Sequence, residues 1–146
     1  MVRRREPERD DEEIESGVVP EDWRPVRDWL REAHAREAIT SGIAVRTWIV
    51  MSFLNAFYKG EGLPSPDSLE LYLDGSTRVA WEVHPPHQFA IIVSAPARVE
   101  VRYANAATGA TWGQFCIGGL MMTEEGDHYL RLAAGLPLPP GEDPSS

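Results

Sequence analysis

Four short runs between residues 69 and 103 alternate between apolar residues and others, and no other feature of the sequence constrains the fold as strongly. In the last run, Val99, Val101 and Tyr103 are separated by charged residues. Period-two alternation is typical of antiparallel strands with one buried face, and the few residues between runs favour hairpin turns. The sequence therefore predicts a four-stranded antiparallel meander, with residues 111–117 as a candidate for a short fifth strand.

The alternation also predicts the register of the sheet, because a slip of one residue would turn every side chain over. Keeping the apolar faces together pairs Leu71 with Val79, Val79 with Val93, and Ile91 with Val101. A three-residue turn at positions 74–76 follows, with a left-handed glycine at position 75. A two-residue turn is rejected, because it would put an arginine opposite Leu71.

The outer face of the sheet is predicted to be shallow and rimmed by charge. In the expected register, one row across this face is Ala80, Ile92 and Glu100, and the next row is Glu82, Ala90 and Arg102. The carboxylate and the guanidinium of the second row are then opposed across the sheet. Such a face is either solvated or covered by the C-terminal segment or by a partner.

Two helices are expected before the sheet and one after it. The first runs from about residue 20 to residue 39, with Val26, Leu30 and Ala33 at helical spacing, and Gly42 is its expected left-handed stop. The second runs from about residue 43 to residue 59, and the last over residues 124–134 with Thr123 as its cap. The predicted fold class is α+β, with the helices on one face of the sheet.

The second helix is apolar nearly all round, and a helix of this kind is buried on most sides. One sheet covers an apolar stripe of roughly 100°, so a second surface has to cover the rest. We expect a second copy of the chain or a protein partner to do so, with Trp48 or Phe57 near the contact. The alternative is a monomer in which the first and last helices close the core.

Composition limits the class of protein. The chain has 146 residues, one cysteine and a net charge of −9, which fits one domain in a reducing compartment, and we expect the cytoplasm. Residues 1–19 are charged and residues 136–146 are rich in proline, so both are expected to be disordered around a single domain of residues 20–135. Neither a secretory signal nor a membrane span is expected, and the acidity argues against nucleic acid as a direct ligand.

Few residues have the spacing of a chemical site. His84 and His87 flank two prolines and are weak candidates for metal ligands, because the other histidines lie on expected helices. Cys116 and His128 are candidates for a nucleophile and its base, although a lone cysteine is more often part of the core. The glycines near residue 113 do not form a phosphate-binding pattern. Neither a metal nor another cofactor is expected.

The remaining candidates are residues that bind a partner. The chain has five tryptophans, and partly exposed tryptophans are enriched at binding hot spots. Trp48 and Trp81 are expected in the core, and Trp48 is also expected near the contact with a partner. The residues predicted to bind are Trp48, Phe57, Glu82, Arg102 and Trp112.

From the second helix onward the chain resembles a loosely defined group of small uncharacterised bacterial proteins. Their pattern is an apolar helix, a proline-rich connector, a strand, an Asp-Gly turn and a strand that ends in Trp-Glu. In this sequence the matching residues are Phe53–Tyr58, Pro64 and Pro66, Leu69–Leu73, Asp74–Gly75 and Trp81–Glu82. The resemblance implies a small domain that serves as an accessory or antitoxin-like partner of another protein.

The leading prediction for function is therefore a non-enzymatic protein-interaction module, such as an accessory, antitoxin-like, mobile-element or phage regulatory protein. The same prediction includes self-association of the chain through the second helix. The alternative is a small-ligand-binding protein or an enzyme that uses the loop 104–119 with Cys116 and His128.

Overall fold

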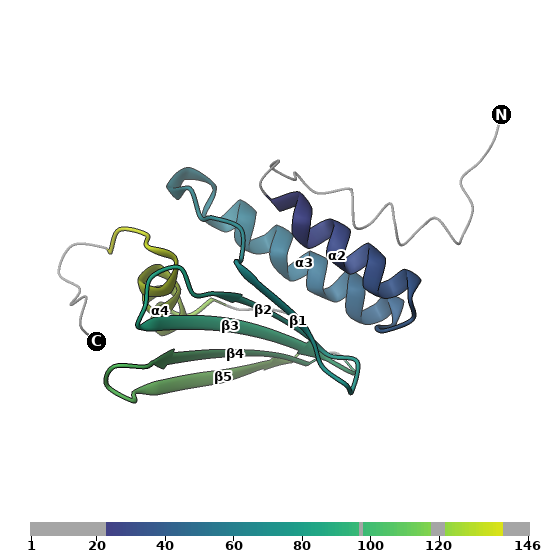
Figure 1. Ribbon diagram of the computed structural model, residues 1–146. Helices are drawn as coiled ribbons and strands as arrows, with labels where there is room; N and C mark the ends of the chain where they lie inside the picture. Colours follow the sequence, from purple (N-terminus) through teal and green to yellow (C-terminus); the bar gives the residue numbers. More distant parts are fainter. Residues whose placement is uncertain (1–22, 97, 118–121, 139–146) are drawn as a thin grey trace.

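A computed structural model of the protein describes residues 23–96, 98–117 and 122–138 (Figure 1). The elements in chain order are α2 (Arg24–Ala35), α3 (Ser41–Phe57), the 3₁₀ turn η3 (Lys59–Glu61), β1 (Ser68–Leu71), β2 (Thr77–Trp81), β3 (His87–Ser94), β4 (Arg98–Asn105), β5 (Thr111–Ile117) and α4 (Glu124–Ala134). The strands form one antiparallel sheet in the order β1-β2-β3-β4-β5. The predicted α+β class is confirmed, and the candidate fifth strand is present. The arm predicted over residues 1–19 lies outside the described residues, as does the tail beyond residue 138.

The boundary between the first two helices differs from the prediction. Gly42 does not stop a helix but lies in the first turn of α3. Thr40 is the N-cap of α3, and its hydroxyl accepts a hydrogen bond from the backbone N–H of Ile43 at 3.2 Å. Threonine satisfies an otherwise unpaired amide at this position, which favours a helix start over a helix end. The left-handed residue between the helices is Glu37, at φ 62°.

The strand register confirms the predicted faces but not every predicted pair. Ile91 pairs with Val101 as expected. Val79 pairs with Leu69 and Ile91, so the predictions that it pairs with Leu71 and Val93 are wrong by two residues. A shift of two residues keeps every side chain on its face, and alternation alone therefore does not detect it.

The shift between β1 and β2 follows from the position of the first turn. Its three residues are 73–75 rather than 74–76, because the backbone N–H of Tyr72 donates to the carbonyl of Ser76. The N–H of Gly75 donates in turn to the carbonyl of Tyr72, and Gly75 has the predicted left-handed φ, 89°. The Asp74 carboxylate accepts from the N–H of Ser76 at 2.9 Å, which stabilises the turn one position earlier than expected.

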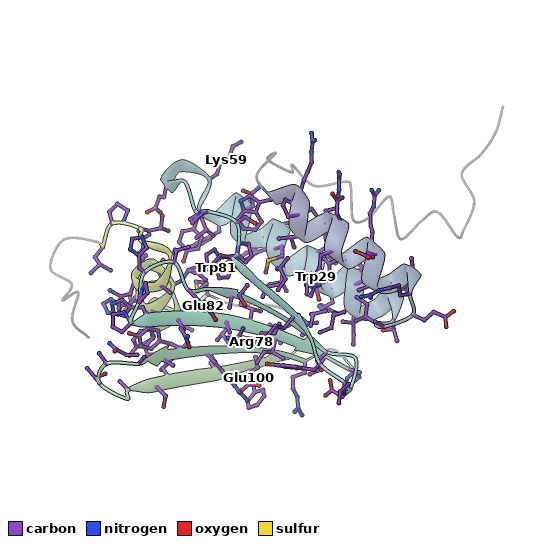
Figure 2. All side chains as sticks on the ribbon, in the orientation of Figure 1. Trp29, Lys59, Arg78, Trp81, Glu82 and Glu100 are labelled. Atoms are coloured by element: carbon purple, nitrogen blue, oxygen red, sulfur yellow. The ribbon has the colours of Figure 1, made fainter. Side chains whose placement is uncertain are left out.

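The core lies between the inner face of the sheet and the three helices (Figure 1). Trp81 is fully buried there, and its ring is 6.4 Å from that of Trp23 and 6.3 Å from that of Phe89. Its indole N–H donates to the carbonyl of Pro64 at 2.7 Å, so the polar atom of this core residue is satisfied. The prediction that Trp81 belongs to the core is confirmed, and Figure 2 shows the residue between the sheet and the helices.

A polar contact joins α3 to the inner face of the sheet. The hydroxyl of Thr47 donates to the carbonyl of Ile43 within the helix, and it lies 2.7 Å from the hydroxyl of Thr77 on β2. Because the Thr47 proton points to Ile43, the Thr77 hydroxyl is the donor between the two threonines. This bond fixes the position of α3 along β2.

The helix α4 is fixed by an ion cluster around Arg131. Its guanidinium forms a bidentate pair with Glu61 of η3 and contacts Asp127 at 2.9 Å. The Tyr58 hydroxyl donates to Asp127 at 2.6 Å. Burial raises the pKa of Tyr58, and the hydrogen bond to Asp127 raises it further, so the phenol stays protonated and keeps donating. Arg131 also donates to the carbonyl of Pro137, which places the residues after α4 against the core.

Within the described residues, no helix has both the length and the apolar character needed to cross a membrane.

Candidate functional site

The large apolar side chains that are exposed on the described helices all lie on the outward face of α3. Ile49, Phe53 and Phe57 recur every four residues along this helix, and their exposed fractions are 52%, 40% and 55%. The opposite side of α3 is buried. Among the described residues, the sheet and α2 thus leave this one face of α3 uncovered, while the other sides are buried or half-buried.

Local packing makes the outward face of α3 a continuous surface. The rings of Phe53 and Phe57 are stacked at a centroid distance of 5.7 Å. Phe57 also contacts the ring of Tyr58 edge-on at 4.9 Å, and Tyr58 is fully buried and bonded to Asp127. The exposed rings are thus supported by the core. Large contiguous apolar patches on folded proteins are common at interaction sites.

Trp48, the other residue predicted at this contact, lies in the core. It is 3% exposed and belongs to the side of α3 that faces inward. Its indole Nε1 is buried and has no hydrogen-bond partner among the described residues. The two residues predicted near the partner contact therefore lie on opposite sides of α3, with Phe57 outward and Trp48 inward.

The second candidate surface is the outer face of the sheet, which none of the described helices covers (Figure 1). It contains a shallow depression of about 560 Å³. Ala90 and Ile92 form its floor, and Arg78, Glu100 and Arg102 form its rim. Two of the predicted features therefore recur here, namely a floor of small apolar residues and a charged rim.

The charges on this outer face are paired differently from the prediction. Glu82 and Arg102 do not face each other, because Ala80 lies opposite Ala90 and Ala90 opposite Arg102. Arg102 instead donates to Glu100 at 2.6 Å, and this hydrogen bond raises the pKa of Arg102.

The other rim cation is Arg78, which lies 3.3 Å from both Glu70 and Glu82. Figure 2 shows Arg78 on the sheet together with Glu82 and Glu100. Acidic side chains thus accompany each arginine of the rim. A ligand in the depression would be held by shape and hydrogen bonds more than by a net charge of the rim.

An aromatic and histidine cluster lies where α4 meets the inner face. The Tyr103 ring stacks on Tyr129 at 4.2 Å, and Trp112 lies 5.3 Å from the same ring. His87 Nδ1 is 2.7 Å from the Tyr103 hydroxyl, and the His128 ring is 5.4 Å from Tyr129. The sequence did not predict this cluster, because it depends on the packing of α4 against β3 and β4.

Three histidines therefore come close together at one end of the sheet. Burial lowers the pKa of His87, and the charges of His84 and His128 lower it further. Nevertheless, no group of three or more metal-ligating residues in the described part of the chain has the geometry to hold a metal ion. His84 lies instead beside Gly135, where an added Cβ would be 2.2 Å from the imidazole, so this position needs glycine.

Cys116, the candidate nucleophile, lies near the C-terminal end of β5. It is 7% exposed, and its sulfur accepts from the Gln114 amide at 3.9 Å. Its neighbour on β4 is Val99, whereas Tyr129, which contacts His128, packs against Trp112 four residues earlier on β5. Four residues of a strand span about 13 Å. The arrangement therefore places Cys116 and the histidine cluster near opposite ends of β5.

The candidate binding residues therefore do not form one site. Phe57 belongs to the outward face of α3, and Arg102 lines the outer depression, where Glu82 pairs with Arg78 of the rim. The ring of Trp112 packs on Tyr129 at the inner face of the sheet. The exposure of Ile49 and Phe53 was not predicted, because helical spacing shows that α3 is apolar all round but not which side the chain leaves open.

Compared with known protein families, curated proteins and solved structures, the chain matches none of them.

Proposed function

We propose that this protein acts by binding another protein through the outward face of α3. The observation that supports the proposal is the row of Ile49, Phe53 and Phe57, each at least 40% exposed. Removing apolar surface from water is favourable by about 25 cal/mol per Å². Exposed side chains of this size therefore favour association with an apolar partner surface. Ring stacking holds Phe53 and Phe57 in place before binding, which reduces the entropy lost on association.

The chemistry of the partner follows from apolarity and charge. The contact itself needs an apolar surface, such as one face of a helix laid along α3. The chain carries a net charge of −9, so a partner with basic residues around its apolar surface would associate faster. A cytoplasmic accessory or antitoxin-like role is consistent with this mode of action and belongs to the same proposal.

The test compares full-length bait proteins in extracts of the native host. The test variant is the double change Phe53→Glu and Phe57→Glu, which places two charges on the exposed rings. The matched control is Leu73→Glu and Val83→Glu, because these side chains are also exposed but lie in hairpin turns, at 109% and 46% exposure. A protein retained by wild type is then purified and titrated against all three baits by calorimetry.

The proposal expects the α3 variant to bind that protein about tenfold more weakly or worse, and the turn variant to bind it as wild type does. Circular dichroism confirms that each bait is folded. Equal affinity for wild type and the α3 variant would overturn the proposal, as would an equal loss in the turn variant.

A second candidate function is supported by the outer depression. A volume of about 560 Å³ lies within the range of small-molecule sites. Arg78, Glu100 and Arg102 offer charged hydrogen-bond groups there, whereas neither Cys116 nor His128 lines it. This alternative is therefore a small-ligand-binding role for the sheet face. Saturable binding of a metabolite that is lost in the Ala90→Trp variant, which fills the floor, would favour it over the α3 proposal.

A further inference from the structure

The strand β5 is a sheet edge with none of the features that usually prevent pairing. In the described part of the chain it pairs with β4 alone. Its seven residues, Thr111–Ile117, contain neither a charged residue nor proline. The other edge, β1, has only four residues and carries Glu70. Natural sheet edges are commonly short, charged or interrupted by proline, and an edge without these features favours pairing with another strand.

The register shows which backbone groups of β5 point away from the sheet. The N–H of Asn105 donates to the carbonyl of Ala110, so this pair is hydrogen-bonded. Hydrogen-bonded and non-hydrogen-bonded pairs alternate along an antiparallel ladder. Trp112, Gln114 and Cys116 therefore direct their backbone groups to β4. The four remaining positions, Thr111, Gly113, Phe115 and Ile117, direct theirs to the free edge.

We propose that two copies of the chain associate by antiparallel pairing of β5 with β5, with the two-fold axis at Gln114. This register matches Thr111 with Ile117 and Gly113 with Phe115 of the second copy. All four outward-pointing positions then fall in hydrogen-bonded pairs, which gives on the order of eight new backbone hydrogen bonds. Registers centred on another residue leave part of the strand unpaired.

The side chains on the outer face fit the same register. Phe115 is 57% exposed, and Arg98 lies over its ring at 5.1 Å. Gly113 is exposed, and an added Cβ there would be in ordinary contact with the Val101 carbonyl oxygen at 3.4 Å and the Cγ of Arg102 at 3.9 Å. Pairing therefore places each phenyl ring over the glycine of the other copy. An aromatic ring opposite a glycine stabilises antiparallel pairs.

This complementarity identifies a second copy as the occupant of the edge. The ring and the glycine are two residues apart on one strand, so a two-fold axis between them makes both contacts at once. An arbitrary extended peptide has the backbone groups but not this match. The inference goes beyond the proposed function, because it uses β5 whereas the partner surface is on α3.

The first test is the oligomeric state of the full-length protein by sedimentation equilibrium at micromolar concentration. Wild type is expected to be dimeric. Phe115→Lys places a charge on the edge and is expected to weaken the dimer about tenfold or more. The matched control is Val83→Lys, which adds the same charge to an exposed apolar position away from β5. A monomeric wild type, or equal dimerisation of wild type and Phe115→Lys, overturns the proposal.

The second test reports the register without relying on the Phe115 variant. Gln114 lies opposite its own copy in a non-hydrogen-bonded pair, where the Cα atoms are about 4.5 Å apart and a disulfide fits. In a Cys116→Ser background, Gln114→Cys is therefore expected to form an intermolecular disulfide under mild oxidation. Thr111→Cys is the control, because its own copy lies about 20 Å away in this register. Equal cross-linking of both variants, or of neither, contradicts the pairing.

The two proposals fail independently. Phe53→Glu and Phe57→Glu should leave the sedimentation of the dimer unchanged, since α3 is not part of the β5 edge. Dimerisation lost through these changes would instead assign self-association to α3 and refute pairing through β5.

Discussion

The two faces of the sheet are stabilised in different ways, although they share the same strands. On the inner face, large side chains such as Trp81, Phe89 and Ile91 are fully buried under the helices. On the outer face, the small residues Ala80 and Ala90 are also at most 5% exposed, although no described helix covers them. Burial on one face therefore comes from packing between layers, and on the other from neighbouring side chains.

The cover on the outer face consists of charged side chains. Arg78 on β2 and Glu82, one residue after β2, lie on either side of Ala80, and their side chains meet at 3.3 Å. A long arginine side chain covers small neighbours with its aliphatic part while its charge remains paired. We therefore expect substitutions on the inner face to alter folding, and substitutions on the outer face to alter mainly what the surface binds.

The largest expected effect is on the inner face. Trp81→Ala removes the central aromatic residue and its contacts with Trp23 and Phe89. It also leaves the Pro64 carbonyl without its donor. We expect the free energy of unfolding to fall by about 3–5 kcal/mol, as for other deleted buried aromatic residues. Urea denaturation followed by circular dichroism measures this change.

The control for that experiment is Trp29→Ala on α2. Trp29 has the same side chain but is only half-buried at the edge of the core (Figure 2). Its loss should cost clearly less than the loss of Trp81. Similar losses for the two variants would show that burial on the inner face does not dominate the stability.

A smaller effect is expected at the ion cluster of α4. Arg131→Met keeps most of the side-chain volume but leaves Asp127 and Glu61 without their cation. Hydrogen bonds to charged groups contribute about 1.5–3 kcal/mol, and the Arg131 side chain is 11% exposed. We therefore expect a loss of about 2 kcal/mol in the free energy of unfolding.

The comparison variant for Arg131 is Arg27→Met. Arg27 also forms an ion pair, but its partner Asp28 is 64% exposed. Exposed pairs of this kind contribute little, so its unfolding free energy should change by less than about 0.5 kcal/mol. A loss at Arg27 equal to that at Arg131 would contradict the distinction between the two pairs.

The histidine cluster predicts how stability depends on pH. The pKa of His87 is lowered in the folded state, mainly by burial, so the unfolded chain binds a proton more readily. The stabilising contribution is present above the unfolded pKa of about 6.5 and is lost as the pH falls below it. Thermal melting between about pH 7.5 and pH 5.5 should show a decrease that is weaker in His87→Asn. If the stability of His87→Asn depended on pH as steeply as that of wild type, His87 would not be the group responsible.

The sequence predicted the faces of the sheet better than its pairs. Alternation decides whether Leu71 and Val79 share a face, and the structure places them on the same side. It does not decide between registers two residues apart, because these bury the same side chains. Between β1 and β2 the choice depends on the Asp74 carboxylate, which accepts from the Ser76 N–H and fixes the turn. The alternation of apolar residues carries no information about a single hydrogen bond within a turn.

The candidate site was predictable only in part, for a related reason. Helical spacing shows that α3 is apolar on every side, but the exposed side depends on where α2 packs, so Phe57 was expected and Phe53 was not. Glu82 and Arg102 were placed together because of the same two-residue shift in β2. His128 joins His84 and His87 only after α4 has packed on the sheet.

The smallest expected effect is on the outer face, at Arg102. This arginine bonds to Glu100 at 2.6 Å, but its side chain is 61% exposed. Water screens such a pair, and holding two long side chains in one geometry costs entropy. Arg102→Met should therefore change the free energy of unfolding by less than about 0.5 kcal/mol.

Arg78→Met is the matched change on the same face, and it should cost more. The Arg78 side chain is 17% exposed and lies near two carboxylates, so about 1 kcal/mol is expected. If Arg102→Met destabilised the protein as much as Arg131→Met, ion pairing would stabilise both faces equally and the contrast between them would fail. If Arg102→Met leaves stability unchanged, the residue is free to serve a ligand in the depression, because the fold does not require it.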